Sequence, residues 1–311
     1  MKADTIGREV IRHINGIVNI AILTIVVLLV AFAGYALWDS KQIFNAADKS
    51  NYEIYKPTAE NGGKSFKELQ ALNPEVIAWL SVYGTNIDYP VTQGADNMKY
   101  VDTNAEGLYS LSGAIFLDYQ NSKDFSDFNS ILYGHHMEKE KMFGEIGSFS
   151  DANIFDSHRY GNLYFDGENH GLEFFAFINA DAYDRSVFTA AVEERDRKKY
   201  LKRLLTKARY KRAIDTTDPE HIVLLVTCSP ASTNGREILV GRITDEVFDD
   251  PFLNAENGSD KGQMSAADRY GVLAVIILLP LILLLILAVR LIVHTRKSSR
   301  KRKRDTRDET A

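Results

Sequence analysis

The sequence predicts a mostly β domain, a barrel or a sandwich with peripheral helices, placed between two membrane-spanning segments. Three observations support this fold class. Short apolar runs separated by turn residues fill the middle of the chain, one charged segment carries a helical apolar face, and two long uncharged stretches flank both. Seven short runs with such punctuation are typical of barrels and sandwiches.

Two stretches are long and apolar enough to cross a bilayer. Residues 17–38 and 271–289 carry no charge, and each is close to the roughly 20 residues that a transmembrane helix needs. Buried core helices are the alternative. An uncleaved first span is favoured over a signal peptide, because the stretch is long for one and no clear Ala-x-Ala site follows it.

The flanking charges predict the orientation of both spans. Lys2, Arg8 and Arg12 precede the first span, and the run RKRKR at 300–304 follows the second. The positive-inside rule therefore places both termini in the cytoplasm and the segment between the spans outside.

The charge of the chain is distributed in the same way. Residues 1–16 have a net charge of +1 and residues 290–311 of +6, so the total of −5 leaves −12 for residues 39–269. An acidic exported region argues against a nucleic acid partner. The basic tail, beside a span, is a contact for anionic lipids.

The exported region begins with helical and polar segments. Residues 39–64 are polar with little periodicity and are expected to be a linker or stalk. Ser65 and Glu68 fit a capping box, and Asn73 followed by Pro74 fits an N-cap with proline at the first helical position. We therefore expect two short helices within 65–80.

The strands and one further helix follow. A helix is expected in 192–210, where Tyr200, Leu201 and Leu204 share one apolar face against the sheet. The seven predicted strands are residues 87–91, 114–117, 130–133, 162–165, 172–180, 222–227 and 237–243.

Cys228 is the only cysteine of the chain and the first candidate for chemistry. The apolar run before it predicts a buried strand, and Ser229-Pro230 ends that run, so the thiol is expected at a strand end. A free thiol outside the cell is liable to oxidation. Its presence indicates either a buried, core-filling cysteine or a nucleophile. Arg236 opens the next strand, and pairing of the two strands would bring thiol and guanidinium together.

His135 is the histidine best placed to assist a thiol. It follows a predicted strand and Gly134, so its ring is presented at a strand end, and histidine exchanges protons near neutral pH. A pair of metal ligands is the alternative interpretation of His135 and His136. Neither HExxH nor a Cys/His zinc spacing is present, so no metal and no cofactor are predicted.

These residues lie in motifs that resemble the sortases. The motifs are VTC at 226–228, YGHHM at 133–137 and Arg236. Three longer segments resemble class B sortases in particular. They are NPEVIAWLSVYGTNIDYPVTQGADNMKY at 73–100, IFLDYQN at 115–121 and SILYGHHMEKEKMFGEIGSF at 130–149. The similarity runs from about residue 66 to 248 and implies a closed β-barrel of about seven to eight strands.

The resemblance also implies a site and a reaction. Cys228 is expected to be the nucleophile, His135 the general acid and base, and Arg236 the group that stabilises substrate and oxyanion. The implied reaction cleaves a C-terminal sorting signal, with an NPxTN-like sequence, on surface or pilin proteins. The acyl group would then pass to an amine of a peptidoglycan cross-bridge or a pilin lysine.

Several alternatives are open at this point. The second span with its basic tail is typical of pilin-polymerising sortases, whereas attachment to the cell wall is the other outcome for this family. A cysteine peptidase would use the same cysteine and histidine with water as acceptor. A non-enzymatic surface scaffold would simply bury Cys228.

The predicted organisation of the chain has seven parts. They are a cytoplasmic N-terminus (1–16), a transmembrane helix (17–38), an extracellular linker (39–64), a sortase catalytic domain (65–248), a second linker (249–270), a transmembrane helix (271–293) and a basic cytoplasmic tail (294–311).

Overall fold

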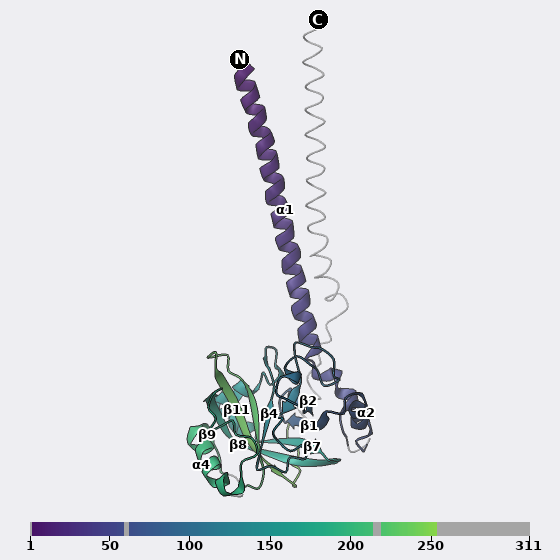
Figure 1. Ribbon diagram of the computed structural model, residues 1–311, viewed down its shortest axis with the longest axis vertical. Coiled ribbons are helices and arrows are strands. Elements are labelled where there is room, and N and C mark those ends of the chain that lie inside the picture. The colour runs from purple at the N-terminus through teal and green to yellow at the C-terminus, as the bar shows by residue number, and fades with distance from the viewer. Residues whose placement is uncertain (1, 59–61, 214–218, 254–311) are drawn as a thin grey trace. The chain divides into compact units, whose positions relative to one another are not determined.

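The computed structural model describes residues 2–58, 62–213 and 219–253 (Figure 1). The described residues fall into two units, one ending at Lys41 and one beginning at Gln42. The first unit is the greater part of helix α1 (Lys2–Ala46), and the second is the β domain.

Helix α1 contains the first predicted span. Its segment Val10–Ala46 contains an 18-residue window with a mean hydropathy of 2.8 and is long and apolar enough to cross a membrane, as judged by length and composition. The second predicted span, 271–293, and the tail, 294–311, lie outside the described residues.

The segment after α1 folds against the β domain. Two 3₁₀ turns, η1 (Lys49–Asn51) and η2 (Glu53–Tyr55), follow the end of α1. Ala47 and Tyr52 are both buried in the main hydrophobic core. Part of the segment predicted as a linker, 39–64, therefore packs with the β domain.

The prediction of two helices within 65–80 was half wrong. Helix α2 (Lys64–Leu72) forms, but it begins after Gly63, and Ser65 donates a hydrogen bond to the Lys56 carbonyl instead of capping. No second helix follows. Asn73 Oδ1 accepts from the Glu75 amide in a local turn, and its side-chain amide donates to the Tyr100 hydroxyl and the Ala105 carbonyl. The residues after it form strand β1 (Val76–Val82).

All seven predicted strands are confirmed, and they close into a barrel with β1 as the eighth. The ladder runs β11-β10-β4-β3-β2-β1-β7-β8, and β8 pairs with β11 to complete the circle. The strands are β2 (Asp88–Thr92), β3 (Ile115–Leu117), β4 (Asn129–Tyr133), β7 (Tyr160–Phe165), β8 (Glu168–Asp181), β10 (Ile222–Cys228) and β11 (Gly235–Thr244).

The helix expected in 192–210 is shorter than predicted. Helix α4 (Arg197–Lys207) occupies its middle, and Ala208 and Tyr210 belong instead to strand β9 (Ala208–Lys211), which pairs with β8. The remaining short elements are η3 (Lys99–Val101), β5 (His136–Met137), β6 (Lys141–Met142), η4 (Ile146–Ser150), α3 (Ala152–Ser157) and η5 (Glu194–Asp196).

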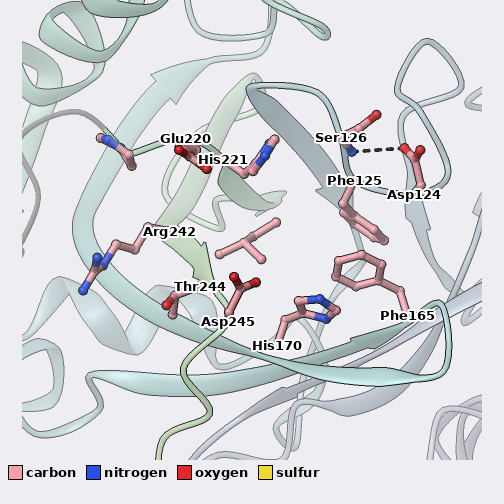
Figure 2. A pocket seen from close by; sticks show the side chains of 12 residues that line it. Asp124, Phe125, Ser126, Phe165, His170, Glu220, His221, Arg242, Thr244 and Asp245 are labelled. Carbon is pink, nitrogen blue, oxygen red and sulfur yellow. Dashed lines mark hydrogen bonds between the residues drawn. The ribbon is translucent and has the colours of Figure 1, made fainter.

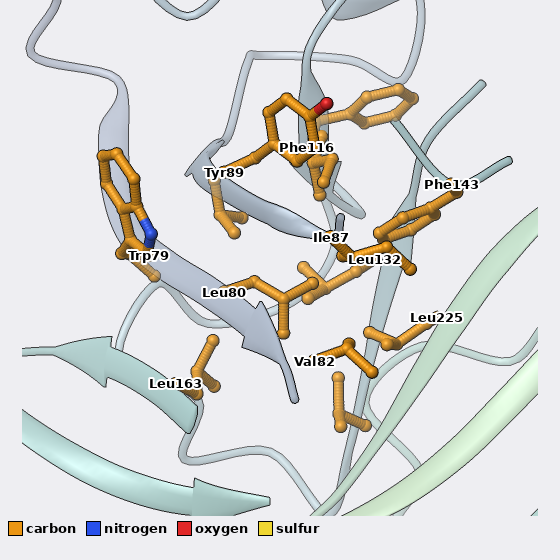
Figure 3. Packing of buried hydrophobic residues seen from close by; sticks show 14 of the residues in the cluster. Trp79, Leu80, Val82, Ile87, Tyr89, Phe116, Leu132, Phe143, Leu163 and Leu225 are labelled. Carbon is orange, nitrogen blue, oxygen red and sulfur yellow. The ribbon is translucent and has the colours of Figure 1, made fainter. Parts of the chain in front are cut away.

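Strand β10 is buried on both faces. Val223 and Leu225 point into the barrel core, where Leu225 packs near Leu132 and Val82 (Figure 3). Ile222, Leu224 and Val226 belong to a second core, which they share with α4. Because side chains alternate between faces, this double burial explains why the strand is continuously apolar.

Candidate active site

Cys228 is the last residue of β10, and its side chain is exposed. The chain turns immediately after it, since the Ser229 amide donates to the Gly235 carbonyl at 2.9 Å. Cys228 is thereby paired with Arg236 in the antiparallel ladder of β10 and β11. The predicted pairing of the two strands that carry Cys228 and Arg236 is confirmed.

His135 reaches the same end of the barrel from β4. Strands β10 and β4 are parallel and in register up to the pair Val226 and Tyr133, so two further residues along each strand lead to Cys228 and His135. The Gly134 amide donates to the Val226 carbonyl at 3.1 Å, and the Thr227 hydroxyl donates to the Gly134 carbonyl at 2.9 Å. These bonds tie the two strand ends together.

The hydrogen bond of the His135 ring defines where its proton lies. Nε2 is 2.7 Å from the carbonyl oxygen of Val101. A carbonyl oxygen only accepts, so Nε2 carries the hydrogen and donates it. In the neutral ring Nδ1 is then the basic nitrogen, the one that can take up a proton.

The three residues line one cavity of about 400 Å³. Apolar side chains from several elements form much of its wall, among them Phe116, Phe188 and Val226. A cavity of this size accommodates a short extended peptide segment in contact with the thiol, the imidazole and the guanidinium.

The turn after Cys228 is anchored by a buried carboxylate, and Arg236 is bonded to the backbone of the same turn. Arg236 Nη1 donates to the Gly235 carbonyl at 2.9 Å. The neighbouring Glu237 is buried, and its Oε1 accepts a hydrogen bond from Ser229 Oγ at 3.1 Å. Ser229 Oγ also accepts from the Ala231 amide. The residue that follows the thiol is therefore fixed on both sides.

Sequence reasoning missed a polar network beside the cavity. Tyr133 Oη donates to Asp118 at 3.1 Å, and the same carboxylate oxygen accepts from Asn97 Nδ2 at 2.9 Å. Burial raises the pKa of the Tyr133 hydroxyl, and the charge of Asp118 raises it further. Asn97 and Asp118 lie within two of the motif blocks quoted above, but nothing in their local sequence distinguishes them from surface residues.

A larger cavity, of about 540 Å³, lies at the other end of the β10–β11 ladder (Figure 2). It is lined by His221 and Arg242, six ladder positions from Cys228 and Arg236 and thus roughly 20 Å away. His221 Nδ1 donates to the Asp127 carbonyl, and His170 stacks on Phe165. Within the described residues, no group of three His, Cys, Asp or Glu side chains is arranged to hold a metal ion.

The comparisons with known proteins point to one family. No family model matches the chain. Sortase B of Listeria monocytogenes is 28% identical over 233 residues, which cover 71% of this chain and 95% of that protein. A solved sortase B from the type II pilus of Streptococcus pneumoniae is 45% identical, with a TM-score of 0.51. The match covers 58% of this chain and 99% of that protein.

A second solved structure agrees. A Streptococcus pyogenes class B sortase involved in pilus biogenesis is 38% identical, with a TM-score of 0.53, over 58% of this chain and 98% of that protein. The closed barrel is thus matched by relatives that are covered over nearly their whole length. The chain belongs to the sortase family of cysteine transpeptidases and groups with the class B sortases.

Proposed function

We propose that Cys228, His135 and Arg236 are the catalytic residues of this sortase, and that they join surface proteins to an amine in two steps. The observation that carries the proposal is the convergence of three strand ends, which places the thiol, the imidazole and the guanidinium around one cavity. All three side chains are at least partly accessible there.

The first step forms a thioester. The Cys228 thiol passes its proton to His135, and the sulfur attacks the carbonyl carbon of the scissile peptide bond. Arg236 stabilises the oxyanion that develops, as positively charged and N–H donors do in such sites. When the C–N bond breaks, the His135 imidazolium donates its proton to the leaving amine.

The second step transfers the acyl group. An incoming amine attacks the thioester carbonyl and gives up a proton to neutral His135, and the C–S bond breaks. The released Cys228 thiolate takes this proton from the His135 imidazolium, which restores the thiol and the neutral ring. Atoms and charges balance over the cycle, so no cofactor is needed. The substrate is a surface or pilin protein with a C-terminal sorting signal that has an NPxTN-like sequence.

We further propose pilin polymerisation over wall attachment as the outcome. The second predicted span supports this choice, as do the relatives at 45% and 38% identity, one from a type II pilus and one involved in pilus biogenesis. In cells, loss of this chain should abolish high-molecular-mass ladders of a pilin-like protein. Persistence of the ladders, with loss only of wall-bound monomer, would favour attachment to peptidoglycan instead.

The catalytic roles are tested with the full-length chain in detergent. A fluorogenic sorting peptide is incubated with and without an amine, and products are identified by mass spectrometry. Cys228→Ala, His135→Ala and Arg236→Ala should each lose activity, whereas His170→Ala, at the far cavity, should not. Wild-type activity in Cys228→Ala would refute the nucleophile, and a product that stays hydrolytic in the presence of amine would indicate a peptidase.

The proposed topology places the catalytic domain, 65–248, outside and both termini in the cytoplasm. In a Cys228→Ala background the chain has no cysteine, so single cysteines report on sidedness. Ser299→Cys should react with a membrane-impermeant maleimide only after cells are permeabilised, whereas Tyr183→Cys, exposed on the barrel, should react in intact cells. Labelling at both positions in intact cells would refute the two-pass arrangement.

A further inference from the structure

A small hairpin follows His135 directly. Strands β5 and β6 form it, with His136 paired to Met142 and Met137 paired to Lys141. At its base the Phe143 amide donates to the His135 carbonyl at 3.0 Å. The hairpin is therefore bonded directly to the His135 backbone, on the side away from β4.

The hairpin has an unfavourable backbone conformation. Lys139, Glu140 and Met142 have φ angles of 58°, 58° and 51°. Residues with side chains rarely adopt this left-handed region, and they stay there only when surrounding contacts hold them. Contacts with other elements must therefore hold this hairpin in place.

Two contacts come from the segment at the end of α1, residues 44–48. The ammonium of Lys141 is 2.6 Å from Asp48 Oδ2, with both side chains only partly exposed. The ammonium of Lys139 lies 4.3 Å from the centre of the Phe44 ring, a cation–π distance. Both lysines of the hairpin are thus held by the 44–48 segment.

A third contact is buried. The Tyr89 hydroxyl donates to the Ala47 carbonyl at 2.9 Å and accepts from the Met142 amide at 3.2 Å. Ala47 and Tyr89 are each 1% exposed. One hydroxyl therefore joins the backbone of the 44–48 segment to the backbone of the hairpin, away from water.

We infer that the 44–48 segment is a positioning element for His135: through Asp48, Phe44 and the Tyr89 bridge it holds the β5–β6 hairpin and with it the histidine. This rests on the proposed catalytic role of His135. Part of the predicted linker, 39–64, then contributes to the proton-transfer step and is more than a spacer between membrane and enzyme.

A purely structural role makes a different prediction. If the segment only added stability, removing a contact would lower the melting temperature and leave the turnover of the folded protein unchanged. If it positions His135, kcat falls for the fully folded protein. KM changes little, because the cavity walls formed by Phe116, Phe188 and Val226 are untouched.

The test uses the full-length chain, far below its melting temperature, with the sorting peptide as substrate. Asp48→Asn, Lys141→Met and Tyr89→Phe should each lower kcat by about tenfold, since small misplacements of a catalytic group have large effects on rate. Lys56→Met is the matched control. Its ion pair with Asp88, at 2.5 Å and with similar exposure, also joins the N-terminal segment to the barrel but leads to β2 rather than to the hairpin.

The charge-reversed pair, Asp48→Lys with Lys141→Asp, provides the rescue. It should recover most of the kcat that either single reversal loses, which a general loss of stability would not. Wild-type kcat in Asp48→Asn and Tyr89→Phe, with His135→Ala inactive, would overturn the inference and leave the proposed function standing. Activity in His135→Ala would instead refute the proposed function itself.

Discussion

Cys228 and Arg236 are directly opposed partners in the β10–β11 ladder. Residues opposed in an antiparallel pair share one face of the sheet, with Cβ atoms about 5 Å apart. The backbone of Arg236 therefore cannot move away from Cys228 without breaking the barrel ladder. The base of its side chain is placed by the fold and not by a mobile loop.

This geometry makes Arg236→Lys an informative change. Lysine keeps the charge but loses the planar, multi-donor fork, so we expect kcat/KM for the sorting peptide to fall about 10²-fold. The rate at which iodoacetamide alkylates Cys228 should remain measurable, which verifies that the site is folded. Near wild-type kinetics would show that charge alone suffices at this position.

Gly134 has no room for a side chain. A Cβ there would lie 2.7 Å from the ring of Phe143, which is fully buried. We expect Gly134→Ala to lower the free energy of unfolding by about 1–3 kcal/mol and to reduce kcat, because it displaces the residue before His135. Urea denaturation and steady-state kinetics measure both effects. Adding Phe143→Leu, which removes the clashing ring atoms, should make the combined loss smaller than the sum of the two.

Glu173 is a buried carboxylate held by two arginines. Its side chain is 2% exposed, and it pairs with Arg159 and, at 2.5 Å, with Arg242. Glu173→Gln leaves two guanidinium groups without their shared counter-charge, and we expect it to lower the free energy of unfolding by about 3 kcal/mol. Since Arg242 lies at the far end of the ladder from Cys228, kcat of the folded protein should be unaffected. A fall in kcat at constant stability would contradict this separation.

Glu145 gives a pH dependence of stability. Burial raises the pKa of its carboxyl, and the hydrogen bond from the Asn86 amide only partly offsets this. The folded protein therefore holds the proton more tightly than the unfolded chain, and stability falls as pH rises from about 4.5, the ordinary pKa of the group, through the raised pKa.

Glu145→Gln removes this titration and keeps an oxygen that accepts from the Asn86 amide. The variant should gain stability relative to the wild type, by more at pH 8 than at pH 5. Urea denaturation at both pH values measures the difference. An equal difference at the two pH values would show that the carboxyl of Glu145 does not contribute in this way.

The strand that carries Cys228 was predictable because the residues that specify it are adjacent in the sequence. A run of β-branched and aliphatic residues ending in Cys228, Ser229 and Pro230 predicts a buried strand and its end, and the structure has both. Local signals failed at Asn73. Asn-Pro favours a helix start, and Asn73 Oδ1 does accept from the nearby Glu75 amide. The partners of its side-chain amide, Tyr100 and Ala105, are however 27 and 32 residues away.

The same limit applies to the site. Cys228, His135 and Arg236 were identified by residue type and motif, and the structure places them around one cavity. The network of Asn97, Asp118 and Tyr133 was not predictable, because it depends on the pairing of β3 with β4. The support of the hairpin by residues 44–48 likewise depends on a tyrosine more than 40 residues away, at position 89.

The double burial of β10 has a consequence for hydrogen exchange. Local opening of this strand would expose Val223 and Leu225 from one core and Leu224 from the other at once, so its amides should exchange only through global unfolding. The backbone that carries Cys228 is then a stationary reference for the other residues that line the cavity.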